Sequence, residues 1–387
     1  MPEAAPALQA RRVDSADFDP AAVEAIVREQ AAELHMRSVI YRVVKDGTPL
    51  VTNALGDSMT GVPATTDMHF RNGAVAIGYL STLLLVLVDQ GVMGLDTSIS
   101  TWIPDFPDAN LVTPRMLITM TAGYPDYVPD PGFAAEFYAD PFRLYTADQL
   151  IERTLAQPRT FTPGENWDYS HGNIVILGKV IEAATGTPLA ELMRAHVLDP
   201  LGLTNTVSTQ TAEIPEPVLH AFSSERKAAL GIPDDGSFSE ESTFWNPSWT
   251  LAPGAVMTTN IADMTTTAID WAEGSLLTPE SHTAQITPLP LGFGSLVEGC
   301  RTCHPLDEVY TYTLGLVKSG DWLLQNPFFG GYVAAAAVLP VERLAIAVAT
   351  TLTTEAFLPN GDYDPAVNGI TIVKAIAATM TDNLPLM

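Results

Sequence analysis

The pattern of hydrophobic and polar positions predicts strands at both ends of the chain and helices between them. Residues 14–35 carry apolar side chains at helical spacing, and residues 37–44 and 50–55 flank a turn typical of a hairpin. Short apolar runs at hairpin spacing recur near the C-terminus, followed by a predicted last helix; the runs cover 309–317, 322–325, 332–339 and 344–350, and the helix covers 365–381. We therefore expect one antiparallel sheet closed by the two ends of the chain.

The middle of the chain is predicted to be mainly helical. Helical patterns cover residues 73–91, 114–120, 146–156, 173–185 and 261–273, whereas 95–108 and most of 210–255 are predicted to be irregular. The apolar run at 73–88 is shorter than the ~20 residues that cross a bilayer, so it predicts a buried helix. We expect a single domain over 1–387, with a sheet lobe at about 1–70 and 290–387 and a helical lobe at about 71–289.

Composition and charge restrict the classes of partner. The 387 residues are 47% hydrophobic and 17% charged, which excludes intrinsic disorder, and the net charge is −26. Such an acidic chain is a poor partner for nucleic acid or for an anionic membrane surface. The first residues lack the regions of a signal peptide, so we expect a cytoplasmic protein as written, or an extracytoplasmic one if a leader was removed.

The two cysteines form the string Cys300-Arg301-Thr302-Cys303-His304. This string matches a haem-attachment pattern, but a short-loop disulfide or a pair of free thiols on a surface turn accounts for it as well. A zinc site would need a second pair of ligands, and the sequence has none. The remaining histidines are scattered and lack the spacing of metal ligands. We therefore expect no metal and no cofactor.

An ordered series of short motifs runs along nearly the whole chain, over about residues 15–380. The motifs are Phe70-Arg71-Asn72-Gly73, residues 88–96, residues 103–107, residues 116–127, Phe161-Thr162-Pro163-Gly164, Tyr169-Ser170-His171, residues 246–249, residues 253–259, residues 313–316 and Gly330-Gly331-Tyr332. This series resembles the serine β-lactamase and DD-peptidase-like hydrolases, which include esterases and acyltransferases. The resemblance implies an α/β (α+β) fold, with an antiparallel sheet flanked by helices and a mainly helical lobe.

The resemblance fails at the residues that carry out the family's chemistry. The family uses a Ser-x-x-Lys pair, but Ala74 and Ile77 occupy these positions, and Ala has no nucleophilic atom. Its Tyr-x-Asn motif keeps Tyr169 but has His171 in place of Asn. Its third motif, a cationic strand, aligns with residues 325–327, where no cation is present. The scaffold is therefore expected without the machinery that forms an acyl-enzyme.

We predict that Tyr169 and His171 form an acid–base pair, because imidazole exchanges protons near neutral pH. Substrate-binding positions are predicted in the cleft between the lobes: Ala74, Ile77, Tyr124, Trp245, Asn246, Gln325, Asn326 and Phe328. Each residue also has a structural interpretation: a packed aromatic, a buried hydrogen-bonded histidine, or an ordinary strand edge.

Three functions are compatible with this site. The first is a divergent protein that binds a small, neutral or apolar molecule and, if it is an enzyme, performs cyclisation, elimination or proton transfer in secondary metabolism without an acyl-enzyme. The second is a non-enzymatic pseudohydrolase that binds a ligand or a protein partner. The third is a hydrolase with a relocated nucleophile such as Ser170 or Ser81. The sequence leaves the oligomeric state open.

Overall fold

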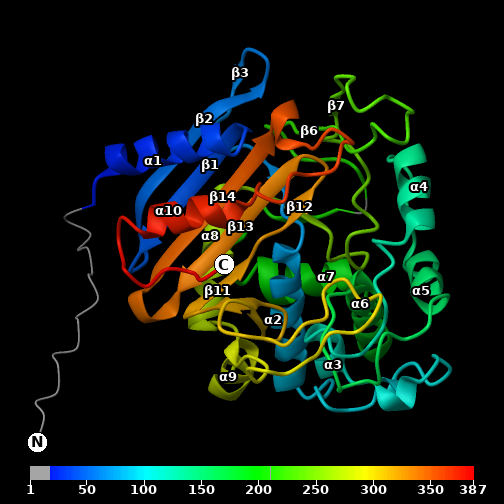
Figure 1. The fold of residues 1–387 in the computed structure, drawn as a ribbon. Coiled ribbons are helices and arrows are strands. Elements are labelled where there is room, and N and C mark those ends of the chain that lie inside the picture. The colour runs from blue at the N-terminus through cyan, green and yellow to red at the C-terminus, as the bar shows by residue number, and fades with distance from the viewer. Residues whose placement is uncertain (1–17, 210) are drawn as a thin grey trace, which may run out of the picture.

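The computed structural model describes residues 18–209 and 211–387, and an antiparallel sheet forms its centre (Figure 1). In the described part of the chain this sheet has nine strands in the order β3-β2-β1-β14-β13-β11-β10-β9, with β12 paired to β13. The strands are β1 Met36–Lys45, β2 Thr48–Met59, β3 Val62–Pro63, β9 Thr311–Tyr312, β10 Val317–Ser319, β11 Trp322–Gln325, β12 Phe328–Phe329, β13 Tyr332–Leu339 and β14 Leu344–Leu352. The N-terminal strands pair directly with C-terminal ones, because β1 lies beside β14 with Ile40 opposite Ala349. The predicted closure of one sheet by both ends of the chain is therefore confirmed.

Helices cover both faces of this sheet. Figure 1 shows α1 and α10 together on one face, where they pack against each other and on β1, β13 and β14, and α8 packs on the same strands from behind. Because both faces are covered, every residue of β13 and β14 is buried, and their small, apolar composition fits that position. The three helices are α1 Pro20–Glu33, α8 Ile261–Glu273 and α10 Gly369–Ala377.

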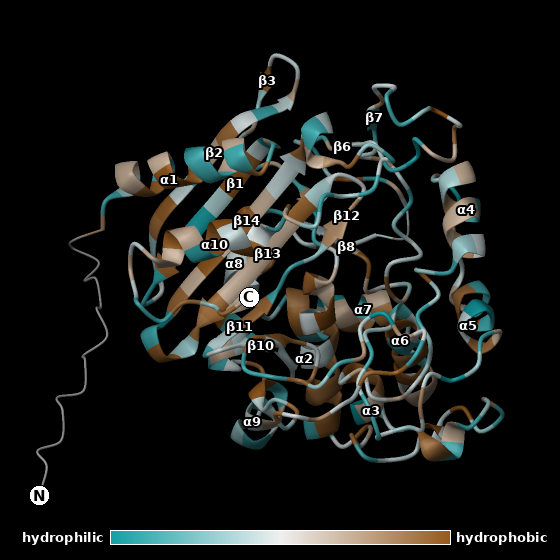
Figure 2. Cartoon of the chain, in the orientation of Figure 1, coloured by the Kyte–Doolittle hydropathy of each residue, from teal (hydrophilic) through white to brown (hydrophobic). Residues whose placement is uncertain are grey.

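The remaining helices form a lobe beside the sheet, built around α2 (Figure 1). They are α2 Val75–Asp89, α3 Pro114–Ile118, α4 Pro131–Ala139, α5 Ala147–Leu155, α6 His171–Thr185, α7 Leu189–Met193 and α9 Pro279–Ile286. Figure 2 shows hydrophobic residues concentrated on α2, which is buried along almost its whole length. Among the described helices, none is both long and apolar enough to cross a membrane, so the run at 73–88 is a core helix.

Two small sheets lie apart from the large one. A three-stranded sheet has the order β4-β8-β5, and a separate ribbon pairs β6 with β7. Their bounds are β4 Phe70–Arg71, β5 Val207–Ser208, β6 Phe222–Ser223, β7 Glu240–Glu241 and β8 Met257–Thr259. Of these, β6 and β7 lie within the segment predicted to be mostly irregular.

Some expectations from the sequence differ from the structure, and one concerns residues outside the described part of the chain. The strand predicted at 309–317 is interrupted, because Gly315 has a φ of +86° and turns the chain between β9 and β10. Helices α4, α7 and α9 were not predicted. The expectation about a signal peptide rests on the first residues of the chain, which lie outside the described part.

Candidate functional site

A cavity of about 680 Å³ opens beside the N-terminal end of α2. Most of its walls come from five further segments that are distant in sequence: residues 125–126 with 128–131, residues 168, 169 and 171, and residues 249–251, 299–302 and 325–329. A cavity of this size, formed where two lobes meet, is typical of a small-molecule site.

The structure brings six of the ten predicted site residues to this cavity. They are Ala74, Tyr169, His171, Gln325, Asn326 and Phe328. Phe328 lies at the rim with 66% of its surface exposed, whereas Gln325 is buried and donates from Nε2 to the Gly315 carbonyl oxygen at 2.8 Å. Residues from all three segments that the resemblance aligns with the family's motifs therefore meet at one place.

The other four predicted residues, Ile77, Tyr124, Trp245 and Asn246, lie outside the cavity lining. Ile77 is fully buried in the core of α2, and Trp245 packs edge-on against Phe137. Tyr124 is buried, and its hydroxyl group donates to a backbone carbonyl. The amide of Asn246 is used in a local turn, where its oxygen accepts from a backbone N–H at 3.0 Å. Core packing and turn formation thus account for these side chains.

Close packing between Gly73 and Pro327 joins two walls of the cavity. Gly73 has a φ of +47°, and a Cβ atom at this position would lie 2.5 Å from Cβ of Pro327. Only glycine combines this backbone conformation with such an approach. The contact holds the start of α2, and with it Ala74, against the segment that follows β11.

The side chain of His171 is held by Asp126, a residue that the sequence analysis did not assign. Nδ1 of His171 lies 3.0 and 3.1 Å from the two carboxylate oxygens of Asp126. Oδ1 of Asp126 also accepts from the backbone N–H groups of Val128 at 3.2 Å and His171 at 3.3 Å. The carboxylate is therefore fixed, and it orients the imidazole so that Nε2 is the nitrogen left for a ligand.

Aromatic rings enclose this imidazole. The ring centroids of Tyr169, Trp249 and Tyr127 lie 5.3, 5.9 and 6.1 Å from that of His171. The hydroxyl group of Tyr127 donates to the backbone carbonyl of Trp249, and the Trp249 ring also contacts Phe329. Trp249 follows shortly after the predicted Trp245 and, unlike Trp245, belongs to the motif at residues 246–249, which is the signal that could have selected it.

The phenol of Tyr169 lies among groups that disfavour its ionised form. Burial raises its pKa well above the ordinary value, and the neighbouring Tyr312 hydroxyl and Asp126 carboxylate raise it further. Tyr169 consequently keeps its proton at neutral pH and is suited to donate a hydrogen bond.

The two serines considered as relocated nucleophiles are not part of the cavity lining. Ser170 is fully buried, and its hydroxyl group donates to the Pro125 carbonyl oxygen at 3.1 Å. Ser81 is also fully buried and donates to the carbonyl oxygen of Leu314. Both hydroxyl groups are therefore engaged with the backbone, away from any ligand in the cleft.

The charge of the cavity wall is mainly negative. Among the described residues that line it, Asp126, Asp130 and Asp168 carry carboxyl groups, and Arg301 at the exposed rim is the one permanent cation. Burial raises the pKa of Asp168, although the hydrogen bond from Thr302 acts in the opposite direction. A ligand carboxylate would meet repulsion here rather than a charge partner.

The cysteine pair lies at the edge of the same cavity as a disulfide. Cys300 and Cys303 are joined, which selects the short-loop disulfide among the three predicted alternatives. Within the described residues, one group of three potential metal ligands occurs, consisting of Asp168, Cys300 and Cys303. Because both sulfur atoms are bonded to each other, neither is a thiolate ligand nor a site for haem attachment in this state.

A sheet covered by helices on both faces, with a cleft at the start of a buried helix, defines the class of two-lobed serine β-lactamase-like proteins. The family model described as "Beta-lactamase" matches residues 23–366. The chain belongs to this family, as the motif series implied.

Curated relatives include esterases and peptidases. The chain is 30% identical over 198 residues to "Esterase EstB" of Burkholderia gladioli, covering 47% of this chain and 50% of that protein. It is 28% identical over 190 residues to "D-aminopeptidase" of Brucella anthropi, covering 48% of this chain and 35% of that protein. The chain thus spans half or less of the length of these relatives.

Solved structures extend the likeness of fold to nearly the whole chain. A D-stereospecific amidohydrolase from Streptomyces sp. superposes with a TM-score of 0.72 at 22% identity, covering 86% of this chain and 94% of that one. D-amino acid amidase from Ochrobactrum anthropi SV3 gives a TM-score of 0.72 at 20% identity, covering 92% and 97%. At these identities the likeness concerns the fold.

Proposed function

We propose that the cleft binds a small, mainly apolar molecule without a carboxylate, and that Tyr169 and His171 exchange protons with it without forming an acyl-enzyme. The observation that carries this proposal is the Asp126–His171 pair, which lies in an aromatic cavity together with Ala74, the residue that the motif series aligns with the family's serine. The mainly negative wall supports the exclusion of carboxylates.

The two side chains divide the acid and base roles. Asp126 accepts from Nδ1–H of His171, which leaves a lone pair on Nε2 to accept a proton from the ligand. Tyr169 donates to the atom on which negative charge develops, because its raised pKa keeps the phenol protonated. This pair supports proton transfer, elimination or cyclisation, in which positioning by the apolar walls supplies much of the rate.

Hydrolysis by directly activated water is a second candidate, favoured by the names of the relatives, which are an esterase and a D-aminopeptidase. Nε2 would then take the proton from a water molecule that attacks the ester or amide carbonyl, and Tyr169 would stabilise the oxyanion. Both reactions use the same residues and need no protein nucleophile.

The binding step is tested by identifying small molecules that remain bound through native purification, using mass spectrometry. A compound retained by the wild type should be lost in Trp249→Ala, because Trp249 forms a wall of the cavity. Phe142→Ala, which removes an exposed aromatic side chain outside the cavity, should retain it.

The catalytic step is tested on the compound so identified. Tyr169→Phe and His171→Ala should each lower turnover by about 100-fold or more. Tyr124→Phe and His196→Ala are matched controls outside the cavity lining and should not change it. Unchanged turnover in both site variants would contradict the acid–base mechanism. If the wild type retains the compound but does not convert it, the non-enzymatic pseudohydrolase is favoured.

A further inference from the structure

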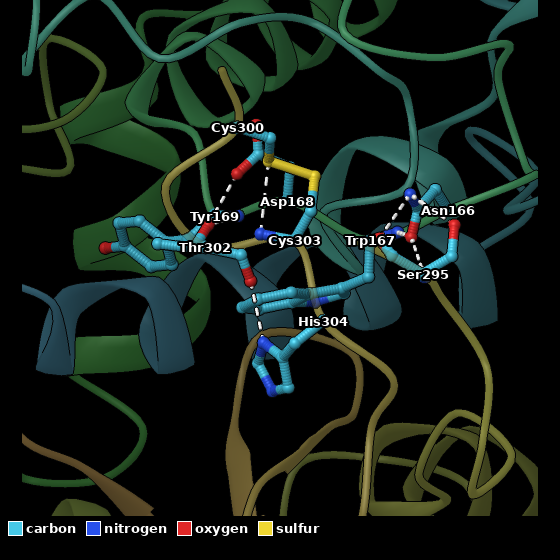
Figure 3. The surroundings of a disulfide bond; sticks show 9 residues. All are labelled: Asn166, Trp167, Asp168, Tyr169, Ser295, Cys300, Thr302, Cys303 and His304. Carbon is cyan, nitrogen blue, oxygen red and sulfur yellow. Dashed lines mark hydrogen bonds between the residues drawn. A yellow bond between two sulfur atoms is a disulfide. The ribbon is translucent and has the colours of Figure 1, made fainter. Parts of the chain in front are cut away.

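The loop of residues 295–304, called here the cysteine loop, contacts residues 166–169, the segment that carries Tyr169 (Figure 3). Ser295 donates its backbone N–H to Oδ1 of Asn166 at 2.9 Å and accepts from that residue's Nδ2 at 3.0 Å. His304 packs edge-on against Trp167, with ring centroids 5.5 Å apart. The loop therefore lies along residues 166–169 and forms part of the cavity wall.

Thr302 makes the contact that matters for the cleft. Its hydroxyl group donates to Oδ1 of Asp168 and accepts from the backbone N–H of Tyr169 at 3.0 Å. The Thr302 side chain thus holds the backbone of Tyr169, whose phenol is the predicted catalytic group. Thr302 is a positioning residue, because it acts through Tyr169.

The disulfide closes the loop around Thr302. Cys300 and Cys303 flank Arg301 and Thr302, so the bridge restricts the backbone on both sides of the Thr302 hydroxyl group. A ring closed by residues only three apart removes less chain entropy from the unfolded state than a long-range cross-link would. Its main effect is therefore expected on the local shape of the loop.

The two sulfur atoms have different environments. Cys300 is partly exposed and lines the cavity, whereas Cys303 is only 4% exposed. The backbone N–H of Cys303 donates to Sγ of Cys300 at 3.1 Å. An incoming thiolate thus has access to Cys300, and the N–H group stabilises the thiolate that forms there on release.

We propose that the Cys300–Cys303 disulfide is a thiol-exchange site, through which an external dithiol frees Thr302 and loosens the hold on Tyr169. The first thiolate of the dithiol attacks Sγ of Cys300, and the Cys303 sulfur leaves and takes up a proton. The second thiol of the reductant then attacks the mixed disulfide, so the dithiol is oxidised to its own disulfide. Both of its hydrogen atoms end on Cys300 and Cys303, and reoxidation reverses each step.

The first test is reduction of the folded protein by dithiothreitol, followed by alkylation and intact-protein mass spectrometry. We expect both cysteines to be alkylated while the far-ultraviolet circular dichroism stays native. Trypsin should then cleave faster after Arg301, which is exposed within the loop. A disulfide that reacts only in denaturant would overturn the proposal.

The second test measures hydrogen exchange at the Tyr169 amide, which is bonded to the Thr302 hydroxyl group in the oxidised protein. Loss of one such hydrogen bond corresponds to roughly tenfold faster exchange on reduction. The Tyr145 amide is a matched control, because it donates to the Ser248 hydroxyl at 2.8 Å, far along the chain from the cysteine loop. Equal protection of Tyr169 in both redox states would contradict the proposal.

Variants separate the role of Thr302 from any general effect of reduction. Thr302→Val in the oxidised protein should speed exchange at Tyr169 by a similar factor, whereas Thr302→Ser keeps the hydroxyl group and should restore protection. A Thr302→Val protein with wild-type exchange at Tyr169 would show that the loop does not position this residue. None of these measurements depends on turnover, so their failure is distinct from failure of the proposed acid–base function.

Discussion

Both carboxylate oxygens of Asp126 lie within 3.1 Å of Nδ1 of His171, 45 residues further along the chain. The relationship arises because Asp126 also accepts the backbone N–H of His171, which is the first residue of α6. One carboxylate therefore sets both the start of the helix and the orientation of the imidazole that it presents to the cleft.

This geometry predicts the tautomer of His171. In its neutral form the imidazole should carry its proton on Nδ1, because the Asp126 carboxylate can only accept. Long-range ¹⁵N–¹H correlation spectra should show a protonated Nδ1 and a bare Nε2. Asp126→Asn should move the proton towards Nε2, and a wild-type spectrum with Nε2 protonated would contradict the assigned base.

The environment of Tyr169 predicts an unusual alkaline titration. Since its pKa is raised well above 10, an ultraviolet difference titration of wild type against Tyr169→Phe should show no ionisation of this residue at pH 10. The unfolded chain releases this proton near pH 10 and the native chain does not, so the free energy of unfolding should fall as pH rises above that value. The Phe variant should lack this contribution. Tyrosinate formation at Tyr169 below pH 10 would show that a positive group lies beside it.

Restoring the family motif should not restore the family's chemistry in one step. Ala74→Ser places a hydroxyl group in the cavity but adds no base, so the variant should fold and remain unreactive towards a fluorophosphonate.

Ile77→Lys should lower the free energy of unfolding by about 3 kcal/mol or more, because Ile77 is fully buried and a lysine there would bring a charge into the core. Chemical denaturation measures the second effect, and an Ile77→Lys variant as stable as wild type would show that the site accepts a cation.

The contact between Gly73 and Pro327 predicts a sensitive position at the start of α2. Gly91→Ala, at a φ of +71° with open space around it, should cost about 1 kcal/mol of unfolding free energy. Gly73→Ala should cost about 2–4 kcal/mol, because its Cβ would also meet the rigid Pro327 ring. Equal losses in the two variants would show that this contact does not hold the cavity walls together.

Much of the fold is readable from the sequence, where periodicity is strong. The ranges predicted at 322–325, 332–339 and 261–273 agree with β11, β13 and α8, because apolar runs at hairpin spacing and one amphipathic helical run leave few alternatives. The short helix α4, Pro131–Ala139, was missed, since nine residues give too few turns for a clear periodic signal.

The cleft was only partly predictable, for physical reasons that particular residues illustrate. Tyr169 and His171 belong to one motif and could be placed together, whereas Asp126 meets them only through the packing of α6. Trp245 was predicted to line the cleft but packs in the core, whereas Trp249, in the motif at residues 246–249, lines the cavity. Tertiary packing, which single-residue chemistry does not encode, decided both cases.

We propose that this member of the beta-lactamase family binds its small molecule, and turns it over if it is an enzyme, without forming a covalent intermediate on serine. Wild-type protein incubated with a fluorophosphonate, and separately with penicillin, is measured by intact-protein mass spectrometry beside an active serine esterase. The account predicts an unchanged mass of 41.5 kDa while the esterase gains an adduct. A stoichiometric adduct on any serine of this chain would contradict it.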